Sequence, residues 1–350
     1  MKCLDKFNKK MRLSGGSLRD ENIKNSQMLL EEIFHDDSSF SKGIYRWELG
    51  LKEYEGRETI KIRFYDRKFS NANGVQIKFQ TLINEPIEVG DILYNSESDE
   101  FLLCTESFNI DNIHWQGKFT LCNWILKWQK KDTGEILEYP CHDINSTQYN
   151  SGETSNRNFT VGSSQHMLTL PCDENTVILN TPQRFYVDKN SKDPTSFIIT
   201  QNDTTSYSYG KKGLVKVTVM EYANDNENDR PDLGICDYFD PEVIKTDNSF
   251  DRYVSKAVIS YDTTEIKSGG DAQIFIGKFY DENGEEITDI PVKWYIICDF
   301  NDELEIKQFD NQIEIGIDND EYVDEEFKLV LSDNLGRYTS SLIIQIESLL

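Results

Sequence analysis

The sequence lacks the features that mark a secreted or membrane-spanning chain. No run of residues approaches the ~18 apolar residues of a membrane span, and no apolar core follows the start of the chain as it would in a secretion signal. The seven cysteines are odd in number, scattered, and without a CxxC pair, which disfavours a disulfide framework or a zinc site. We therefore expect buried free thiols in a chain made in a reducing cytoplasm, with no membrane partner.

The motifs of common enzyme classes are also missing. The four histidines show no HxH, HExxH or HxxxH spacing, and no nucleophile elbow, phosphate-binding loop or dinucleotide fingerprint occurs. With 62 acidic residues, chance carboxylate pairs are so frequent that a glycosidase-like pair carries no information. The sequence thus predicts a protein that is not an enzyme and that holds no cofactor and no metal.

Positive charge is scarce. The formal net charge of −25 disfavours direct nucleic-acid binding, because proteins that neutralise phosphates need clustered Lys and Arg. Residues 241–350 hold 25 acidic against 9 basic residues, so a net −16 lies in the last third. The exception is a short basic arm at the start of the chain, for which we predict contact with a protein partner; a frayed terminus is the alternative. Its basic residues are Lys2, Lys6, Lys9, Lys10 and Arg12.

The sequence is rich in apolar and aromatic residues in repeating patterns. Hydrophobic residues make up 37% of the 350-residue chain, enough for two or three cores. One helix is predicted, from Ser17 to Phe34, and its apolar residues should pack on a sheet or a neighbour. From Arg57 the period changes to two, with Ile62 on the buried side and Arg63 on the exposed side of the first strand. Residues 1–145 are therefore predicted to be the basic arm, the helix and a small β-barrel.

An aromatic hairpin closes this first block. A long strand is predicted from His114 to Gln129, followed by a turn and a strand over Glu135–Tyr139. A polar run over residues 143–158 then marks a boundary before a second β-rich block at 146–240. The aromatic residues of the hairpin would make a sugar-binding platform if exposed, but the interior of the first block is the interpretation that we favour. They are Trp115, Phe119, Trp124, Trp128 and Tyr139.

Residues 254–350 are predicted to form an immunoglobulin-like β-sandwich. Seven short strands follow one another from Ala257 to Ile346, with a tight turn at Glu282–Gly284. Trp294 lies in the third strand, where such sandwiches bury a large aromatic, and no paired Cys accompanies it. The segment resembles the disulfide-free immunoglobulin-like repeats of bacteria and phages. Because Asp237 to Tyr253 is predicted to be a linker, we expect the sandwich to stand apart and project outward. The complete prediction is thus a mainly β protein.

Three stretches within residues 57–140 carry a further resemblance. Val89 to Tyr94 reads VGDILY, Glu100–Cys104 follows it, and Leu121 to Gln129 reads LCNWILKWQ. In this order they resemble the β-barrel of tailed-phage head-completion proteins (head-closure or neck proteins) from phages of Gram-positive hosts. In that family a G-D strand leads to a hairpin and a strand ending near L-K-W/F-Q, and the barrels form rings below the portal.

The resemblance implies a virion structural protein of the phage head–tail junction. Its partners would be portal, adaptor or tail components, together with copies of itself in a homo-oligomeric ring. Simple head-closure proteins are about one barrel long, so the second block and the sandwich depart from the family pattern. One alternative is a capsid decoration or head-fibre protein that binds host or mucus carbohydrate. A second alternative is a carbohydrate-active enzyme with an accessory immunoglobulin-like module.

Overall fold

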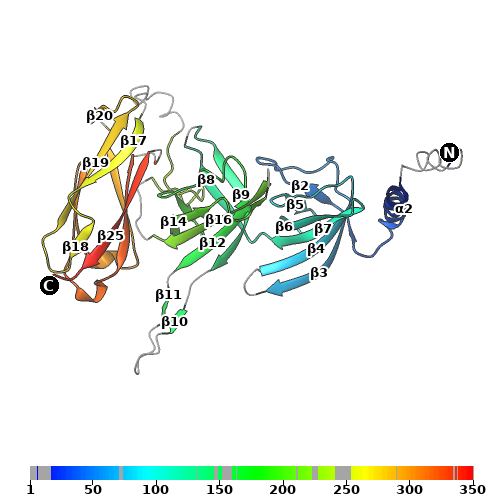
Figure 1. The fold of residues 1–350 in the computed structure, drawn as a ribbon, viewed down its shortest axis with the longest axis horizontal. Coiled ribbons are helices and arrows are strands. Elements are labelled where there is room, and N and C mark those ends of the chain that lie inside the picture. The colour runs from blue at the N-terminus through cyan, green and yellow to red at the C-terminus, as the bar shows by residue number, and fades with distance from the viewer. Residues whose placement is uncertain are drawn as a thin grey trace.

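The computed structural model shows a mainly β protein, with 52% of the described residues in strands and 8% in helices. It describes residues 6, 17–70, 74–131, 133–145, 149–151, 160–162, 164–209, 212–222, 228–240, 254–288, 290–333, 336 and 338–349. Three β units follow one another along the long axis of the molecule, and a helix lies at the end of the first (Figure 1). Across these ranges, no helix has both the length and the apolar character needed to cross a membrane.

The predicted helix is confirmed as α2, Leu18–Ile33. Its start follows from local chemistry: the Ser17 hydroxyl accepts a hydrogen bond from the Asp20 amide at 3.1 Å, which satisfies one of the free N–H groups of the first turn. Asp20 and Glu21 place negative charge at the positive end of the helix dipole. The helix ends at Phe34, whose side chain is buried in the first β unit.

The first β unit is a small barrel, as predicted. Its sheet is antiparallel and has the strand order β1-β3-β4-β7-β6-β5-β2. The edge strands β1 and β2 are separated by only two residues, so one short segment pairs with both β3 and β5 and draws the sheet closed. Ile62, Phe79 and Phe119 are buried at its centre. The strands are β1 (Phe40–Ser41), β2 (Ile44–Arg46), β3 (Ile62–Ser70), β4 (Gly74–Leu82), β5 (Ile92–Asn95), β6 (Glu100–Ile110) and β7 (His114–Leu121).

The long aromatic strand predicted from His114 to Gln129 is wrong: it is two strands in two sheets. β7 ends at Leu121, and β8 (Trp124–Gln129) begins the second β unit. Between them, the Asn123 side chain donates to the Asp143 carbonyl at 2.8 Å and accepts from its amide at 2.7 Å. The side-chain amide of Asn123 thereby takes the place of one backbone pair of the β-ladder. At this point the chain passes from the first sheet into the second.

The second β unit begins earlier than the predicted boundary after residue 145. The hairpin of β8 and β9 (Ile136–Asn145) forms as predicted, but β9 pairs with β12 (Gln165–Pro171) and so belongs to the second sheet. The order β13-β14-β16-β12-β9-β8 brings the edge strands together, with the Trp128 and Phe185 rings 6.1 Å apart. The other strands are β13 (Arg184–Tyr186), β14 (Ser196–Asp203), β15 (Ser208–Tyr209) and β16 (Lys212–Glu221), with a ribbon of β10 (Tyr149–Ser151) and β11 (Thr160–Gly162).

Residues 228–240 lie against the second barrel near this seam. The buried guanidinium of Arg184 donates to both carboxylate oxygens of Asp237, at 3.0 and 2.9 Å, and to Asp229 at 2.5 Å. The Gln129 amide donates to the Phe239 carbonyl and accepts from its N–H, at 2.9 and 3.0 Å. Asp237 to Asp240 is therefore attached to the barrel, contrary to its prediction as linker; residues 241–253 lie outside the described residues.

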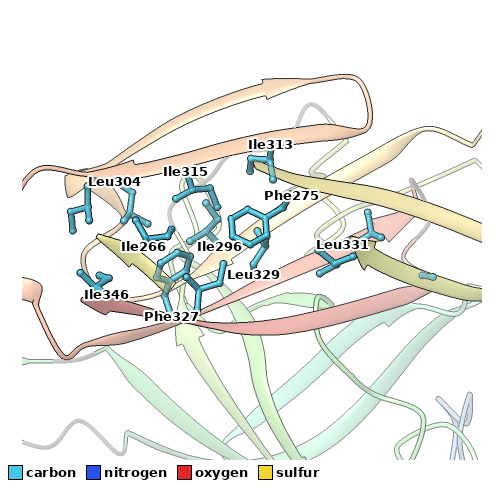
Figure 2. Packing of buried hydrophobic residues seen from close by; sticks show 14 of the residues in the cluster. Ile266, Phe275, Ile296, Leu304, Ile313, Ile315, Phe327, Leu329, Leu331 and Ile346 are labelled. Carbon is cyan, nitrogen blue, oxygen red and sulfur yellow. The ribbon is translucent and has the colours of Figure 1, made fainter. Parts of the chain in front are cut away.

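The third unit is an immunoglobulin-like sandwich. One sheet has the order β17-β19-β23-β22, with β20 on β19, and the other β18-β25-β24-β21; these are the ABED and CFG arrangements of the immunoglobulin fold. Figure 2 shows Phe275, Ile315 and Phe327 in the core between them. The strands are β17 (Val254–Tyr261), β18 (Glu265–Lys267), β19 (Gln273–Asp281), β20 (Glu286–Ile287), β21 (Val292–Ile297), β22 (Leu304–Phe309), β23 (Gln312–Ile317), β24 (Glu326–Asp333) and β25 (Thr339–Glu347), with one-turn helices η2 (Asn301–Glu303) and η3 (Asp320–Tyr322).

A glycine lies beside the core tryptophan of the sandwich, at a position where a side chain would not fit without displacing its neighbours. Trp294 on β21 packs against the core, as predicted. A Cβ on Gly277 of β19 would lie 2.5 Å from Leu331 Cδ1 and 3.2 Å from Trp294 Cζ2. Strands β19, β21 and β24 therefore meet here through the close approach of Leu331 and Trp294 to the bare backbone of Gly277, whereas antibody domains link their two sheets with a disulfide.

Gly277→Ala should destabilise the sandwich by about 1–3 kcal/mol, because the added methyl forces Leu331 and Trp294 out of their packed positions. The matched control is Gly316→Ala on β23, where the nearest atom to the new Cβ is 3.4 Å away. Denaturant unfolding of the whole chain should show a lower midpoint for the first variant alone. Equal midpoints would show that the site tolerates the methyl.

The first and second barrels meet at a backbone contact. Gly90, at φ 93°, approaches β16 so closely that a Cβ would lie 2.3 Å from the Gly213 carbonyl oxygen. Beside it, Asp91 accepts from Lys212 of β16 at 2.7 Å and from Arg46 of β2 at 3.1 Å. Ile92, Leu103 and Leu214 bury an apolar cluster across the same junction. The Gly90-Asp91 pair, singled out in the sequence, thus joins the two barrels.

The sandwich packs against the second barrel, so the expectation that it stands apart is wrong. Ile297 and Val330, on the outer face of the β21–β24 sheet, pack with Ile198 of β14 and Met220 of β16. Lys131, in the β8–β9 turn, donates to the Gly336 carbonyl at 2.5 Å. The acidic charge of the sandwich does not prevent this docking, because the residues at the contact are apolar.

The junction between the barrels also contains a buried histidine. His142 of β9 lies with Nδ1 3.0 Å from the Leu121 carbonyl oxygen, so Nδ1 carries the proton and donates. Within the described chain, its Nε2 is buried without a hydrogen-bond partner. Burial lowers the pKa of His142, against the opposing effects of the Leu121 carbonyl and Asp143, because a second proton on the ring would be an unmatched buried donor.

Acidification should therefore weaken the fold through His142. The unfolded chain takes up a proton as pH falls through about 6.5, whereas the folded chain resists it until lower pH, so stability is lost on going from pH 7 toward the depressed folded pKa. The melting temperature of His142→Asn should fall less steeply over this window than that of the wild type. The exposed control His35→Asn should keep the wild-type slope; equal slopes for all three proteins would contradict the assignment.

Candidate assembly surface

Helix α2 is attached to the first barrel at its C-terminal end. The buried Arg63 of β3 donates to the Phe34 carbonyl at 3.0 Å and to the Ile33 carbonyl at 2.6 Å. Its guanidinium also lies 4.3 Å from the centre of the Phe34 ring. One side chain thus donates to two carbonyls at the end of the helix, of which that of Ile33 also accepts from the Asp36 amide at 3.2 Å, and puts positive charge at the negative end of the helix dipole. We call this arrangement the Arg63 clamp.

The chain that leaves the helix is held by a second set of bonds. Asp37 accepts from the Ser39 amide at 2.8 Å and hydroxyl at 2.7 Å, and lies 3.6 Å from Arg63. The hydrogen bonds from Ser39 lower the pKa of Asp37, with a smaller contribution from the charge of Arg63. Gln27 of α2 reaches the Asn112 carbonyl at 2.5 Å. These contacts fix the direction in which α2 leaves the barrel.

One side of α2 carries four exposed apolar side chains among polar ones. We call Leu18, Met28, Leu29 and Ile33 the α2 stripe; 66%, 68%, 61% and 47% of their respective surfaces are exposed. At 100° per residue, Leu18, Leu29 and Ile33 fall within about 60° of one another around the helix, and Met28 lies about 80° from Leu18 on the other side. The half-buried Ile23 and Leu30 face the barrel instead. The helix therefore exposes four apolar side chains, and exposed apolar groups that lie together are typical of an interaction surface.

The predicted basic arm is only partly within the described residues. Lys2, Lys9, Lys10 and Arg12 lie outside them, and Lys6 is exposed. The arm remains a predicted partner contact. It precedes α2 in the chain.

The aromatic residues of the predicted hairpin pack inside the protein, which is the interpretation that we favour. Three of the five, however, belong to the second unit and not to the first. Trp128 and Tyr139 are buried in the second barrel with ring centres 5.0 Å apart, and the half-buried Trp124 packs on the same core. Trp115 and Phe119 belong to the first barrel, where Phe119 is buried and Trp115 Nε1 donates to the Ile83 carbonyl at 3.3 Å. These residues form no shared exposed face, so the sugar-platform hypothesis is wrong for them.

Sequence reasoning missed the Arg63 clamp. Alternation along the first strand placed Arg63 on the exposed side, whereas the structure buries it. Its partners, the Ile33 and Phe34 carbonyls, are 30 and 29 residues earlier, so no local signal marks them. The apolar residues of the α2 stripe were visible in the sequence, but spacing alone does not tell which of them face the barrel.

The described part of the chain holds no group of three or more His, Cys, Asp or Glu side chains placed to bind a metal ion. Its six described cysteines are free: Cys104, Cys122, Cys141, Cys172, Cys236 and Cys298. Comparison with known proteins gives no match to any family model and none to any curated protein.

Arg63→Gln should release α2 from the barrel, since two carbonyls lose charge-assisted donors, each worth about 1.5–3 kcal/mol. Hydrogen exchange of residues 18–33 should become faster by tenfold or more, while exchange in the barrel core changes little. Arg57→Gln, which breaks an exposed ion pair with Glu48, is the control and should leave α2 protected. Equal exchange in the two variants would show that the clamp does not hold the helix.

Proposed function

We propose that this chain is a non-catalytic virion structural protein of the phage head–tail junction and that it assembles through its N-terminal end. Two lines of reasoning support the proposal. The first is the resemblance of residues 57–140 to head-completion barrels. Two of its three stretches, Val89 to Tyr94 and Glu100–Cys104, lie in the first barrel, whereas most of the third, Leu121 to Gln129, is β8 of the second barrel. The second is the α2 stripe, an apolar surface held outward on a fixed helix. The stripe is the observation that carries the proposal.

Burial of the α2 stripe supplies a physical reason for assembly. Each apolar side chain moved from water into a protein contact contributes about 25 cal/mol per Å² of buried surface. Because the Arg63 clamp already orders the helix, little conformational entropy is lost when a partner covers it. Glu21 and Glu32 lie between Met28 and Leu18 around the helix and would favour a partner with basic residues in its groove.

The proposed partners are portal, adaptor or tail components, which the helix and the basic arm would contact. Copies of the chain would form a ring through heterologous contacts, in which one face of each copy meets a different face of the next. The sandwich, docked on the second barrel at the far end of the molecule, would lie away from that contact (Figure 1).

The test is incorporation into phage particles. Leu29→Glu combined with Ile33→Glu puts two charges on the α2 stripe and should reduce incorporation at least tenfold, because a buried unpaired charge is strongly unfavourable. Both positions are exposed, so folding should be unaffected. The control is Ile178→Glu, at a loop position with a comparable exposed fraction of 57%, which should incorporate normally.

Imaging of particles that carry the labelled wild-type chain decides the location. Label at the head–tail junction is the expected result. Label over the capsid surface would instead favour the decoration or head-fibre protein that binds carbohydrate. Absence from particles together with turnover of glycans would favour the carbohydrate-active enzyme. Normal incorporation of the double variant would remove the α2 stripe from the proposal.

A further inference from the structure

A polar cavity of about 210 Å³ lies where the second barrel meets the sandwich. The β8–β9 turn contributes Lys131, β13 contributes Arg184, and the attached segment contributes Asp237. The sandwich completes the wall with Lys293 and Tyr295 of β21. The cavity is therefore formed only when the sandwich is docked.

The three cations of the wall are not equivalent. Arg184 is neutralised by Asp237 and Asp229, which it contacts directly. Lys131 and Lys293 are partly buried, and in the described ranges neither ammonium has a carboxylate oxygen within 4.0 Å. Two lysines without direct ion pairs thus face one cavity in a protein of net charge −25.

In the part of the chain that the structure describes, the ammonium of Lys131 keeps unmatched hydrogen-bond donors although the side chain is partly buried. Its ammonium has three donors, and the one hydrogen bond found for it in the described structure is to the Gly336 carbonyl. Burial lowers the pKa of Lys131, while Asp333 and Asp237 act in the opposite direction. Those carboxylates have other engagements: Asp237 accepts from Arg184, and Asp333 accepts from the Tyr338 amide at 3.0 Å.

We propose that this cavity binds a small oxyanion, a phosphate or carboxylate group, between Lys131 and Lys293. A volume of about 210 Å³ exceeds the ~30 Å³ of one water several-fold, so it holds such a group with its hydration. A bound anion supplies acceptors for the unmatched ammonium donors and links the β8–β9 turn to β21. Because both sides of the junction contribute a lysine, the anion stabilises the docked sandwich, independently of where the protein assembles.

The test is isothermal titration of the full-length protein with inorganic phosphate and, separately, with succinate, at ionic strength held constant with sodium chloride. Saturable binding of at least one of them is expected, and comparison of the two distinguishes phosphate from carboxylate. Lys131→Met and Lys293→Met should each weaken binding at least tenfold. The control Lys278→Met lies in the sandwich on an exposed ion pair with Glu286 and should bind as the wild type does.

The two lysine variants keep the outcome interpretable. Lys293→Met changes a different unit from Lys131→Met, so misfolding of one, seen as a lowered melting temperature, leaves the other as a test. Anion binding should also raise the melting temperature of the wild type, and this rise should be smaller in both variants. No binding above the sodium chloride reference, or wild-type affinity in a folded Lys131→Met, would overturn the proposal.

Discussion

The buried pairing of Arg184 with Asp229 and Asp237 is the constraint on which the second half of the molecule depends. It places a full guanidinium charge at the edge of a barrel, matched by two carboxylates, and breaking such a buried pairing costs about 3–5 kcal/mol. The pair holds residues 228–240 against the barrel near its seam. That segment in turn forms one wall of the cavity and is the last described part of the chain before the sandwich.

Much of the fold follows from local sequence. All seven strands predicted for the sandwich exist, because turn residues and alternating apolar residues determine them locally. The parallel pairing of β18 with β25 was not predictable, since its partners are about 80 residues apart. The break after Leu121 was hidden because β7 and β8 are both aromatic and only the Asn123 bridge to Asp143 separates them. For the assembly surface, the sequence predicted the helix and its apolar residues but neither the Arg63 clamp nor which side is exposed.

The sandwich is strongly acidic as a whole, but the face by which it contacts the second barrel is apolar. Its net charge of −16 suggested a unit held apart by hydration, yet the face that meets the second barrel carries Ile297, Val330 and Tyr295. Local composition of a contact face decides docking, whereas net charge describes the long-range field. Asp91 also has a local role. It belongs to the sequence pattern that resembles the phage family, and in the structure it pairs with Lys212 at the junction of the two barrels.

The linear order of the three units has a mechanical consequence. Figure 1 places α2 and the sandwich at opposite ends, so tension applied between them passes through the Arg63 clamp, the contact of Gly90 with Gly213 and the sandwich junction in series. Elements in series bear the same load, and the weakest yields first. The sandwich junction consists of a small apolar cluster and the Lys131 bond, whereas each unit is held by the hydrogen-bonded ladders of its sheets. Under load the molecule would therefore lengthen by undocking whole units, and it would regain its shape when the load is removed.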